Sequence, residues 1–215
     1  MRKIGVITGD IVDSTKIPLE MRSQLSKNLL LITSKIESFY KVQTKFYRGD
    51  SVQMIVDDPI DTLTVSFLMR SGVMSITPRR EKPLWDIRVS ASVGDWELDD
   101  LDFAMSDGEA FRLSGRGLDN MKKNRIVFSS PWDSVNAEMA VCTAFFDVMA
   151  SRWTKSQAQT VFEHILNPGS RSRLADTLDK SMQSVSRTLN TAGYVPIDLS
   201  IARFEQVISK MIHDD

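Results

Sequence analysis

Two aspartates follow short apolar segments, where they could bind one divalent cation together. Asp10 comes just after the apolar run 4–8, which is typical of a buried strand that ends in a carboxylate. Asp50 follows Gly49 between segments 44–47 and 51–56, a pattern that predicts a hairpin with its turn at Gly49 and Asp50. Mg²⁺ and Mn²⁺ prefer oxygen ligands, often two carboxylates and the phosphate oxygens of a substrate. If the two strands are neighbours, Asp10 and Asp50 form a metal site; each aspartate taken alone is typical of a turn.

Apolar spacing predicts the elements that position these aspartates. The pattern indicates helices over 18–39, 57–74, 108–123 and 130–153, and strands over 44–47, 51–56, 85–93 and 126–128. Segment 94–107 is rich in aspartate, and we expect a solvated loop there. The order β, α, β, β, α, β, α, β repeats the strand–helix–strand unit. It predicts an α+β fold with a ferredoxin-like βαββαβ sheet and its helices on one face.

Composition excludes several classes of protein. The 215 residues carry 27 basic and 28 acidic side chains, so no global field favours nucleic acid or a membrane as a partner. The single cysteine, Cys142, excludes an internal disulfide and fits a reducing compartment. No signal peptide and no membrane span is recognisable. We therefore expect a cytoplasmic protein with no membrane partner.

The pattern changes near Arg152, which predicts an α+β domain over 1–150 and a small all-α domain over 151–215. Ala175, Asp179 and Val185 have the offsets of a helix-turn-helix, and Ser181 would open its second helix. Residues 151–215 hold eight basic and seven acidic residues, so DNA contacts and purely protein contacts both stay open. If the module binds DNA, its contacts would come from Arg171, Arg173, Lys180, Gln183, Ser184 and Arg187.

Four segments resemble class III nucleotidyl cyclases: 10–15 and Gly49–Asp50 resemble the two metal motifs, 87–94 the next strand, and 108–116 the following helix. The resemblance covers about the first 130 residues. It implies that Asp10, Asp50 and the Ile11 carbonyl hold Mg²⁺ or Mn²⁺, and that Arg116 stabilises the transferring phosphate across a homodimer interface. The chain departs from the pattern at two positions: Phe46 stands where the family reads the base, and Arg112 stands where an amide orients the phosphate.

The chain also resembles the SatD family over nearly its whole length, through segments 7–11, 48–51 and 106–111 and the C-terminal helix-turn-helix. This resemblance implies an architecture more than an activity. Our leading hypothesis is a cytoplasmic regulator with a nucleotide- and metal-binding cyclase-like domain coupled to a DNA-binding helix-turn-helix. The alternatives are a metal-dependent nucleotidyl enzyme whose C-terminal helices serve assembly, and a scaffold in which both sites are relics. The nucleotide itself is not indicated by the sequence.

Overall fold

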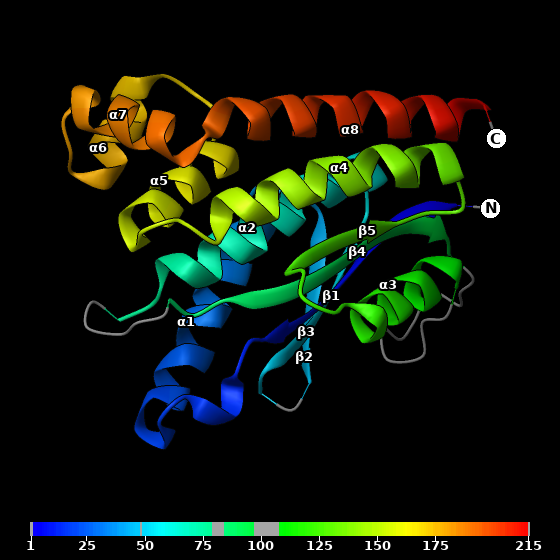
Figure 1. Cartoon of the computed structure of the whole chain (residues 1–215), viewed down its shortest axis with the longest axis horizontal. Coiled ribbons are helices and arrows are strands. Elements are labelled where there is room, and N and C mark those ends of the chain that lie inside the picture. The colour runs from blue at the N-terminus through cyan, green and yellow to red at the C-terminus, as the bar shows by residue number, and fades with distance from the viewer. Residues whose placement is uncertain (1, 48, 79–83, 97–107, 215) are drawn as a thin grey trace.

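A five-stranded sheet forms the centre of the molecule (Figure 1). The computed structural model describes residues 2–47, 49–78, 84–96 and 108–214. The strands lie in the order β2-β3-β1-β4-β5, and every neighbouring pair is antiparallel except β4 and β5. Their bounds are β1 Lys3–Ile11, β2 Val42–Tyr47, β3 Ser51–Val56, β4 Ile87–Asp95 and β5 Ile126–Ser129. The first four strands have the ferredoxin-like arrangement, so the predicted α+β fold class is confirmed.

Alternating side chains of β1 divide the sheet into two faces. Ile7 and Ile11 belong to the main core, together with α1 (Leu19–Glu37), α2 (Thr62–Ser75) and α4 (Asp133–Ala150). Ile4 and Val6 point to the opposite face, where they form a small cluster with Ala110 of α3 (Glu109–Asn120). The two helices of the βαββαβ unit therefore share one face as predicted. Helix α3, however, covers the opposite face of the sheet, which the prediction of helices on one face did not foresee.

Helix α2 is buried on all sides, although its sequence predicted only one apolar face. The sheet lies against one side of α2, and α5 (Lys155–Leu166) packs against it as well. A close approach at its N-terminal end requires a glycine on β1, since a Cβ at Gly5 would lie 2.0 Å from Thr62 Oγ1. The fully buried Arg70 of α2 is neutralised by Asp86 and Asp147. This helix is the layer between the sheet and the C-terminal segment.

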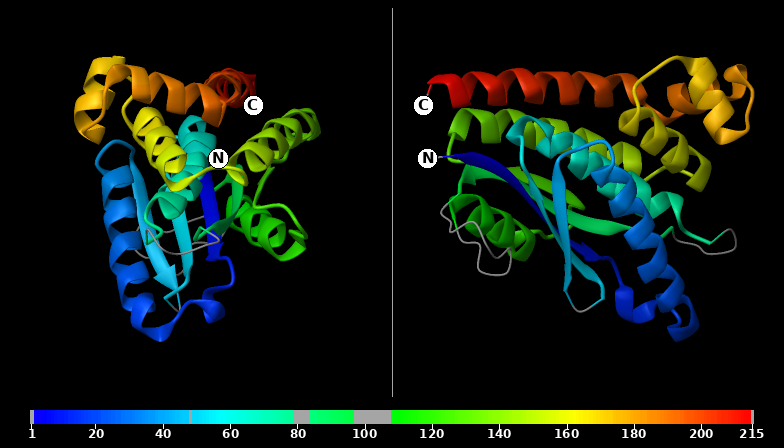
Figure 2. Two further views of the ribbon diagram at one scale, coloured as in Figure 1. Left: turned by 60° about the vertical axis from the view of Figure 1, so that its left-hand side comes forward. Right: turned by 180° about the vertical axis from the view of Figure 1, so that it is seen from behind.

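The C-terminal helices α5, α6 (Arg171–Leu178), α7 (Met182–Ala192) and α8 (Tyr194–Asp214) join the main core through residues such as Phe162. Trp153 Nε1 donates to Ala192 O at 2.9 Å, and α8 runs beside α4, so both chain termini lie at one end (Figures 1 and 2). The contacts show a continuous apolar core from the sheet to Phe204. The division into domains at residue 150 stays a prediction.

Several element bounds differ from those predicted. Helix α1 ends at Glu37, so Phe39 lies beyond it and is exposed. Strand β4 continues to Asp95, and the rest of the acidic segment, 97–107, lies outside the described residues. The C-terminal segment, predicted only as a small all-α domain, ends in the long helix α8 of 21 residues. Its proline, Pro196, lies in the first helical turn, where no intrahelical N–H bond is lost.

A tight turn joins α6 to α7, at the position predicted for a helix-turn-helix. Asp179 takes the left-handed conformation with φ 51°, and Ser181 Oγ accepts a hydrogen bond from Ser184 N. Ala175 and Val185 are buried, as the offsets required. The geometry agrees with the pattern, while DNA binding by these helices stays a prediction.

Candidate metal and nucleotide site

Asp10 lies on β1 and Asp50 in the turn just before the neighbouring strand β3, at the same end of the sheet. The antiparallel register of β1 and β3 places Asp10 opposite Ser51, the residue after Asp50. Ile11 N donates to Asp50 O at 3.0 Å, which fixes the hairpin turn against the end of β1. The Ile11 side chain is buried in the core. Two segments some forty residues apart in sequence are therefore adjacent at the residues that the metal hypothesis requires.

The two carboxylates bond different partners. Asp10 Oδ2 accepts from Arg88 Nη2 at 2.6 Å, and Asp10 Oδ1 lies 3.4 Å from Ser51 Oγ. Asp50 Oδ2 accepts from Ser14 Oγ at 2.8 Å. The sequence alone did not indicate Arg88 as a partner, because the ion pair depends on the register between β1 and β4, which puts Arg88 directly opposite Asp10. In this structure a guanidinium therefore neutralises the first aspartate.

The oxygen ligands at this site suit Mg²⁺ or Mn²⁺ only when water and phosphate oxygens complete the coordination. The described residues contain no group of three or more His, Cys, Asp or Glu side chains that could hold a metal. Two carboxylates and a backbone carbonyl still fit Mg²⁺, which is commonly bound through one or two carboxylates, water and substrate phosphates. By donor type, Asp10, Asp50 and the Ile11 carbonyl would meet that requirement once Arg88 releases Asp10. They do not meet the requirement of a cation held by protein ligands alone.

We expect Arg88→Gln to raise the affinity for Mn²⁺ by about threefold to tenfold, because it removes the cation that competes for Asp10 Oδ2. The titration would follow free Mn²⁺ by electron paramagnetic resonance. Arg2→Gln is the matched control, because Arg2 pairs with Asp57 at the opposite end of β1 and its loss changes net charge equally. Lower affinity in Arg88→Gln than in the control would mean that Arg88 positions Asp10 and does not compete with the metal.

Phe46, at the position expected to read the base, does not face this site. It packs against the main core opposite Val52, on the helical face of the sheet. The neighbouring residues Lys45 and Tyr47 pair with Gln53 and Ser51, so they lie on the same face as Asp10. Tyr47 Oη donates to Gln53 Oε1 at 3.5 Å, and Lys45 Nζ lies 5.7 Å from the Tyr47 ring centroid. These side chains, rather than Phe46, border Asp10 on the sheet.

Arg116 and Arg112 project from α3 and are both exposed. Arg116 lines a cavity of about 590 Å³ between α3 and β5, together with Lys122 and Lys123. Among the described residues that line this cavity there is no carboxylate, and their net charge is positive, which suits an anion. The lining of the cavity does not include Asp10 or Asp50. Within one chain, the structure therefore does not bring Arg116 to the two aspartates.

The residues predicted to contact DNA differ in their availability. Arg171 lies over the Tyr194 ring at 4.5 Å and donates to His164 Nδ1 at 3.4 Å, and Lys180 Nζ donates to Ser156 Oγ at 2.9 Å. Both side chains are therefore engaged within the protein. The other four, by contrast, are exposed: Arg173, Gln183, Ser184 and Arg187.

Comparisons with known proteins give structural likeness alone. No protein-family model and no curated protein matches the chain. The guanylyl cyclase Cya2 overlaps with a TM-score of 0.49 and 14% identity, over 65% of this chain and 78% of that chain. A bacterial light-regulated adenylyl cyclase gives 0.48 and 17%, over 71% and 81%. The dimeric guanylyl cyclase domain of a RhoGC fusion protein from the aquatic fungus Blastocladiella emersonii gives 0.47 and 15%, over 57% and 76%. At these TM-scores the likeness supports no conclusion about activity, and membership of the SatD family stays a prediction.

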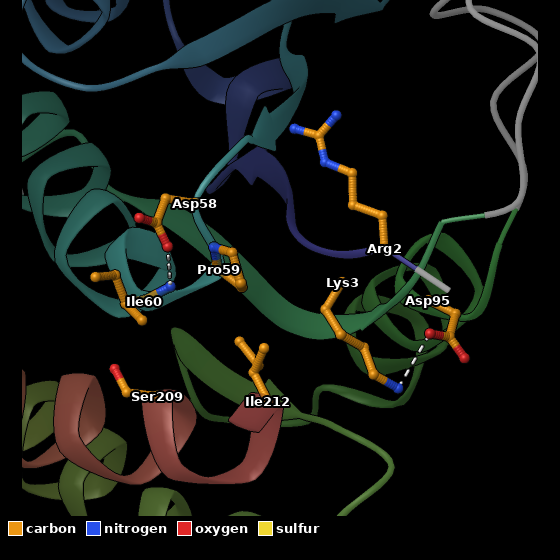
Figure 3. Close-up of a pocket in the computed structure, with 8 residues that line it drawn as sticks. All are labelled: Arg2, Lys3, Asp58, Pro59, Ile60, Asp95, Ser209 and Ile212. Carbon is orange, nitrogen blue, oxygen red and sulfur yellow. Dashed lines mark hydrogen bonds and ion pairs between the residues drawn. The ribbon is translucent and has the colours of Figure 1, made fainter. Parts of the chain in front are cut away.

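A cavity of about 770 Å³ lies at the opposite end of β1 from Asp10 (Figure 3). Arg2 and Lys3 line it, but Arg2 pairs with Asp57 and Lys3 pairs with Asp95 at 3.0 Å. Figure 3 shows Lys3 of β1 and Asp95 of the neighbouring strand β4 pointing toward each other. Its cations are thus already neutralised, and size alone does not make it the functional site.

None of the described helices combines the length and apolar character that a membrane crossing requires.

A group of acids with raised pKa values lies near the start of α2. Burial, followed by the charges of Asp58 and Glu205, raises the pKa of Asp61 to about 6. Burial also raises the pKa of Glu205. The pKa of Tyr40 is raised to about 12, first by burial and then by Asp61 and Glu205. Burial is the largest cause of all three pKa shifts, and the charges of neighbouring acids add to it for Asp61 and Tyr40.

Asp61→Asn should stabilise the protein above pH 7. The folded-state pKa of Asp61 is raised from 3.8 to about 6, so its contribution to stability is present below pH 3.8 and is lost as the pH rises through 6. The side chain is only half-buried, so we expect a gain of up to about 1 kcal/mol in the free energy of unfolding at pH 7.5. Urea unfolding at pH 4 and pH 7.5 would measure it, with exposed Asp176→Asn as control. An equal effect at both pH values would contradict the assignment.

Proposed function

We propose that the protein is a metal-dependent nucleotide-binding protein of the nucleotidyl cyclase type, acting on a nucleoside triphosphate. The observation that supports this proposal is the adjacency of Asp10 and Asp50 at one end of a βαββαβ sheet, with Ile11 N bonded to Asp50 O. A bound Mg²⁺ or Mn²⁺ would neutralise phosphate charge and polarise the phosphoryl oxygens. Asp10, Asp50 and the Ile11 carbonyl would hold it, and Arg88 would turn from Asp10 toward the substrate phosphates.

The polar face beside Asp10 would bind the base and sugar. Tyr47 is exposed and aromatic, which suits stacking on a base. The Gln53 amide supplies a donor and an acceptor on the same face. Because Phe46 belongs to the core, base selection in this protein uses other side chains than the cyclase pattern implies. The binding experiment therefore uses both ATP and GTP.

A homodimer would complete the site. Arg116 lies in a cavity lined by α3 and β5 residues, whereas Asp10 contacts Arg88 and Ser51. A second copy can bring the cavity with Arg116, Lys122 and Lys123 to the triphosphate that is held by Asp10 and Asp50 of the first copy. These cations then bind the phosphate charge that two carboxylates alone would repel.

Thermal unfolding with nucleotides tests the proposal. A ligand that binds only the folded state raises its stability by RT ln(1 + [L]/Kd), about 2.7 kcal/mol at a hundredfold excess over Kd. We expect ATP or GTP with Mn²⁺ to raise the melting temperature, and the shift to vanish without Mn²⁺ and in Asp50→Asn. If neither purine nucleotide shifts the melting temperature with Mn²⁺ present, the proposed function is wrong.

A second candidate function is DNA binding, favoured by the α6–turn–α7 geometry and the exposed start of α7. On this proposal Gln183 and Arg187 would meet base edges while Arg173 contacts the backbone. Arg187→Ala should then cost about 1 to 3 kcal/mol of binding and relax specificity at one base position, whereas Arg173→Ala should weaken all sequences and reduce the salt slope by about one. Selection from random duplexes, followed by titration at physiological salt, would measure both. Failure to enrich any sequence would exclude this function.

A further inference from the structure

Helix α4 has an apolar stripe on its outer side that no other described residue covers. Its members recur at spacings of three and four, so they lie on one face of the helix: Ala137, Ala140, Val141, Ala144, Phe145 and Val148. All six are exposed, and Val141, Phe145 and Val148 keep 56%, 63% and 53% of their surface accessible. The opposite face of α4, which includes Met139 and Phe146, packs on the main core. Helix α4 is therefore apolar on two sides, and the described chain uses only one of them.

Helix α8 extends this surface along one edge of the stripe. Arg203 Nε of α8 donates to Glu138 Oε1 of α4 at 2.5 Å. Just before α8 begins, a Cβ at Gly193 would lie 2.6 Å from Met149 Sδ near the other end of α4. These two contacts show that α8 runs antiparallel to α4 and beside it (Figure 1). Leu199 lies one turn before Arg203 and is 65% exposed, so it continues the apolar surface beside the stripe.

The exposed area is sufficient for a specific interface. The stripe and Leu199 expose roughly 500 Å² per copy, and burying two such surfaces gives roughly 1,000 Å², the lower bound for a biological interface. Contiguous apolar patches of this size on a monomer commonly mark an interaction site. Helix α4 has acids but no lysine or arginine, whereas helices that bind anionic membranes carry basic residues beside their apolar face. The surface therefore fits a protein partner better than a membrane.

The stripe is complementary to itself in an antiparallel arrangement. Four of its residues alternate at spacings of four and three, which is the seam of a coiled coil: Ala137, Val141, Ala144 and Val148. With a two-fold axis between residues 142 and 143, Ala137 faces Val148 of the second copy. In the next layer Val141 faces Ala144 of the second copy. Each layer combines a small and a larger side chain, so the two helices pack evenly at one distance. A parallel pair would instead place valine on valine and alanine on alanine, which alternately crowds the seam and leaves it open.

We propose that a second copy of this chain covers the stripe, with the two α4 helices antiparallel. The contact is isologous, because the same residues serve on both copies, and it closes after two copies. Phe145 lies two turns after Glu138 on the side of α8, so Phe145 and Leu199 form the edge of the interface. Helix α4 packs on the face of the sheet opposite to α3. The contact is therefore separate from the one through which Arg116 of a second copy would reach the nucleotide.

The mass of the full chain in solution tests the pairing. We expect sedimentation equilibrium at tens of micromolar to show self-association of the wild type. Val141→Lys puts a charge into the centre of the seam on each copy, so it should weaken the association at least about tenfold and halve the mass of the particle. Leu31→Lys is the matched control, because Leu31 is 68% exposed on α1, and it should leave the mass unchanged. Neither change should unfold the protein, because both positions are exposed.

Disulfide formation tests the register. Ala137→Cys and Val148→Cys are made separately, and the wild type with its Cys142 gives the background. In the proposed register each new cysteine lies about 16 Å along the helix from the same position of the second copy, whereas the Cα atoms of a disulfide are at most about 7 Å apart. We therefore expect a crosslinked dimer only after the two variants are mixed and have exchanged subunits. Thr188→Cys, exposed on α7, should not crosslink with either variant.

Three results would overturn the proposal. A wild type that stays monomeric at tens of micromolar would show that no second copy covers the stripe, and its sedimentation with phosphatidylglycerol vesicles would assign the stripe to a membrane. An unchanged mass in Val141→Lys would place the self-association elsewhere. Disulfide formation by Ala137→Cys alone would show a parallel arrangement. None of these results depends on whether nucleotides bind at Asp10 and Asp50, so this proposal and the proposed function can fail separately.

Discussion

Replacing Arg70 by methionine should lower the free energy of unfolding by about 3 to 5 kcal/mol. Arg70 is fully buried on α2, and its guanidinium donates to Asp86 at 2.9 Å and to Asp147 at 2.6 Å. The arginine thus joins α2 to the start of β4 and to α4. Without it, two carboxylates that are 18% and 15% exposed would remain without their main cation. Urea unfolding followed by circular dichroism would measure the loss.

The triple variant Arg70→Met, Asp86→Asn and Asp147→Asn separates charge from packing. Asparagine keeps an acceptor for Ile87 N and Arg125 N, which the two aspartates now bond. We therefore expect the triple variant to recover most of the stability that the single change removes. Arg152→Met, an exposed arginine, should stay within about 0.5 kcal/mol of the wild type. Failure of the triple variant to recover would show that Arg70 acts mainly through packing against Phe146.

Local sequence signals predicted the elements and turns well because their causes are local. The Gly49 turn has φ 79°, a conformation that glycine adopts at little cost, and it joins β2 to β3 as expected. Ser170 and Ser181 cap their helices through side-chain oxygens. The order of strands and helices followed from apolar periodicity, and it was sufficient for the βαββαβ unit.

Contacts between distant segments could not be predicted in the same way. The Arg88–Asp10 pair joins residues 78 positions apart, and it exists because the register of β4 on β1 sets them opposite each other. Arg70 was not predicted to be buried, because a charged residue inside an apolar helix gives no sign of partners on other elements. Phe46 did carry a signal, since it alternates with Lys45 and Tyr47 along β2, and that alternation indicates a core-facing residue.

Mixing two inactive variants should restore nucleotide binding if the site is shared between subunits. Asp50→Asn removes a metal ligand, and Arg116→Ala removes a phosphate-binding cation from the α3–β5 cavity. On the proposed function, each variant alone should bind Mn²⁺ and a fluorescent nucleoside triphosphate at least about tenfold more weakly, a loss of about 1.4 kcal/mol or more. Neither change should unfold the protein, because Arg116 is exposed and Asp50 lies in a partly exposed turn.

In an equimolar mixture that has exchanged subunits, about half of the dimers are mixed, and each mixed dimer holds one complete site. We therefore expect about one quarter of the wild-type binding sites to reappear in the mixture. A mixture of Asp10→Asn with Asp50→Asn is the control, because both changes damage the same half of the site and no exchange can repair it. If the Asp50→Asn and Arg116→Ala mixture recovers nothing while light scattering shows dimers, the aspartates and Arg116 do not act together across the interface. If the wild type is monomeric at tens of micromolar and still binds Mn²⁺ and nucleotide, the phosphate must be bound by cations of the same chain, and among the described residues Arg88 contacts Asp10 at 2.6 Å.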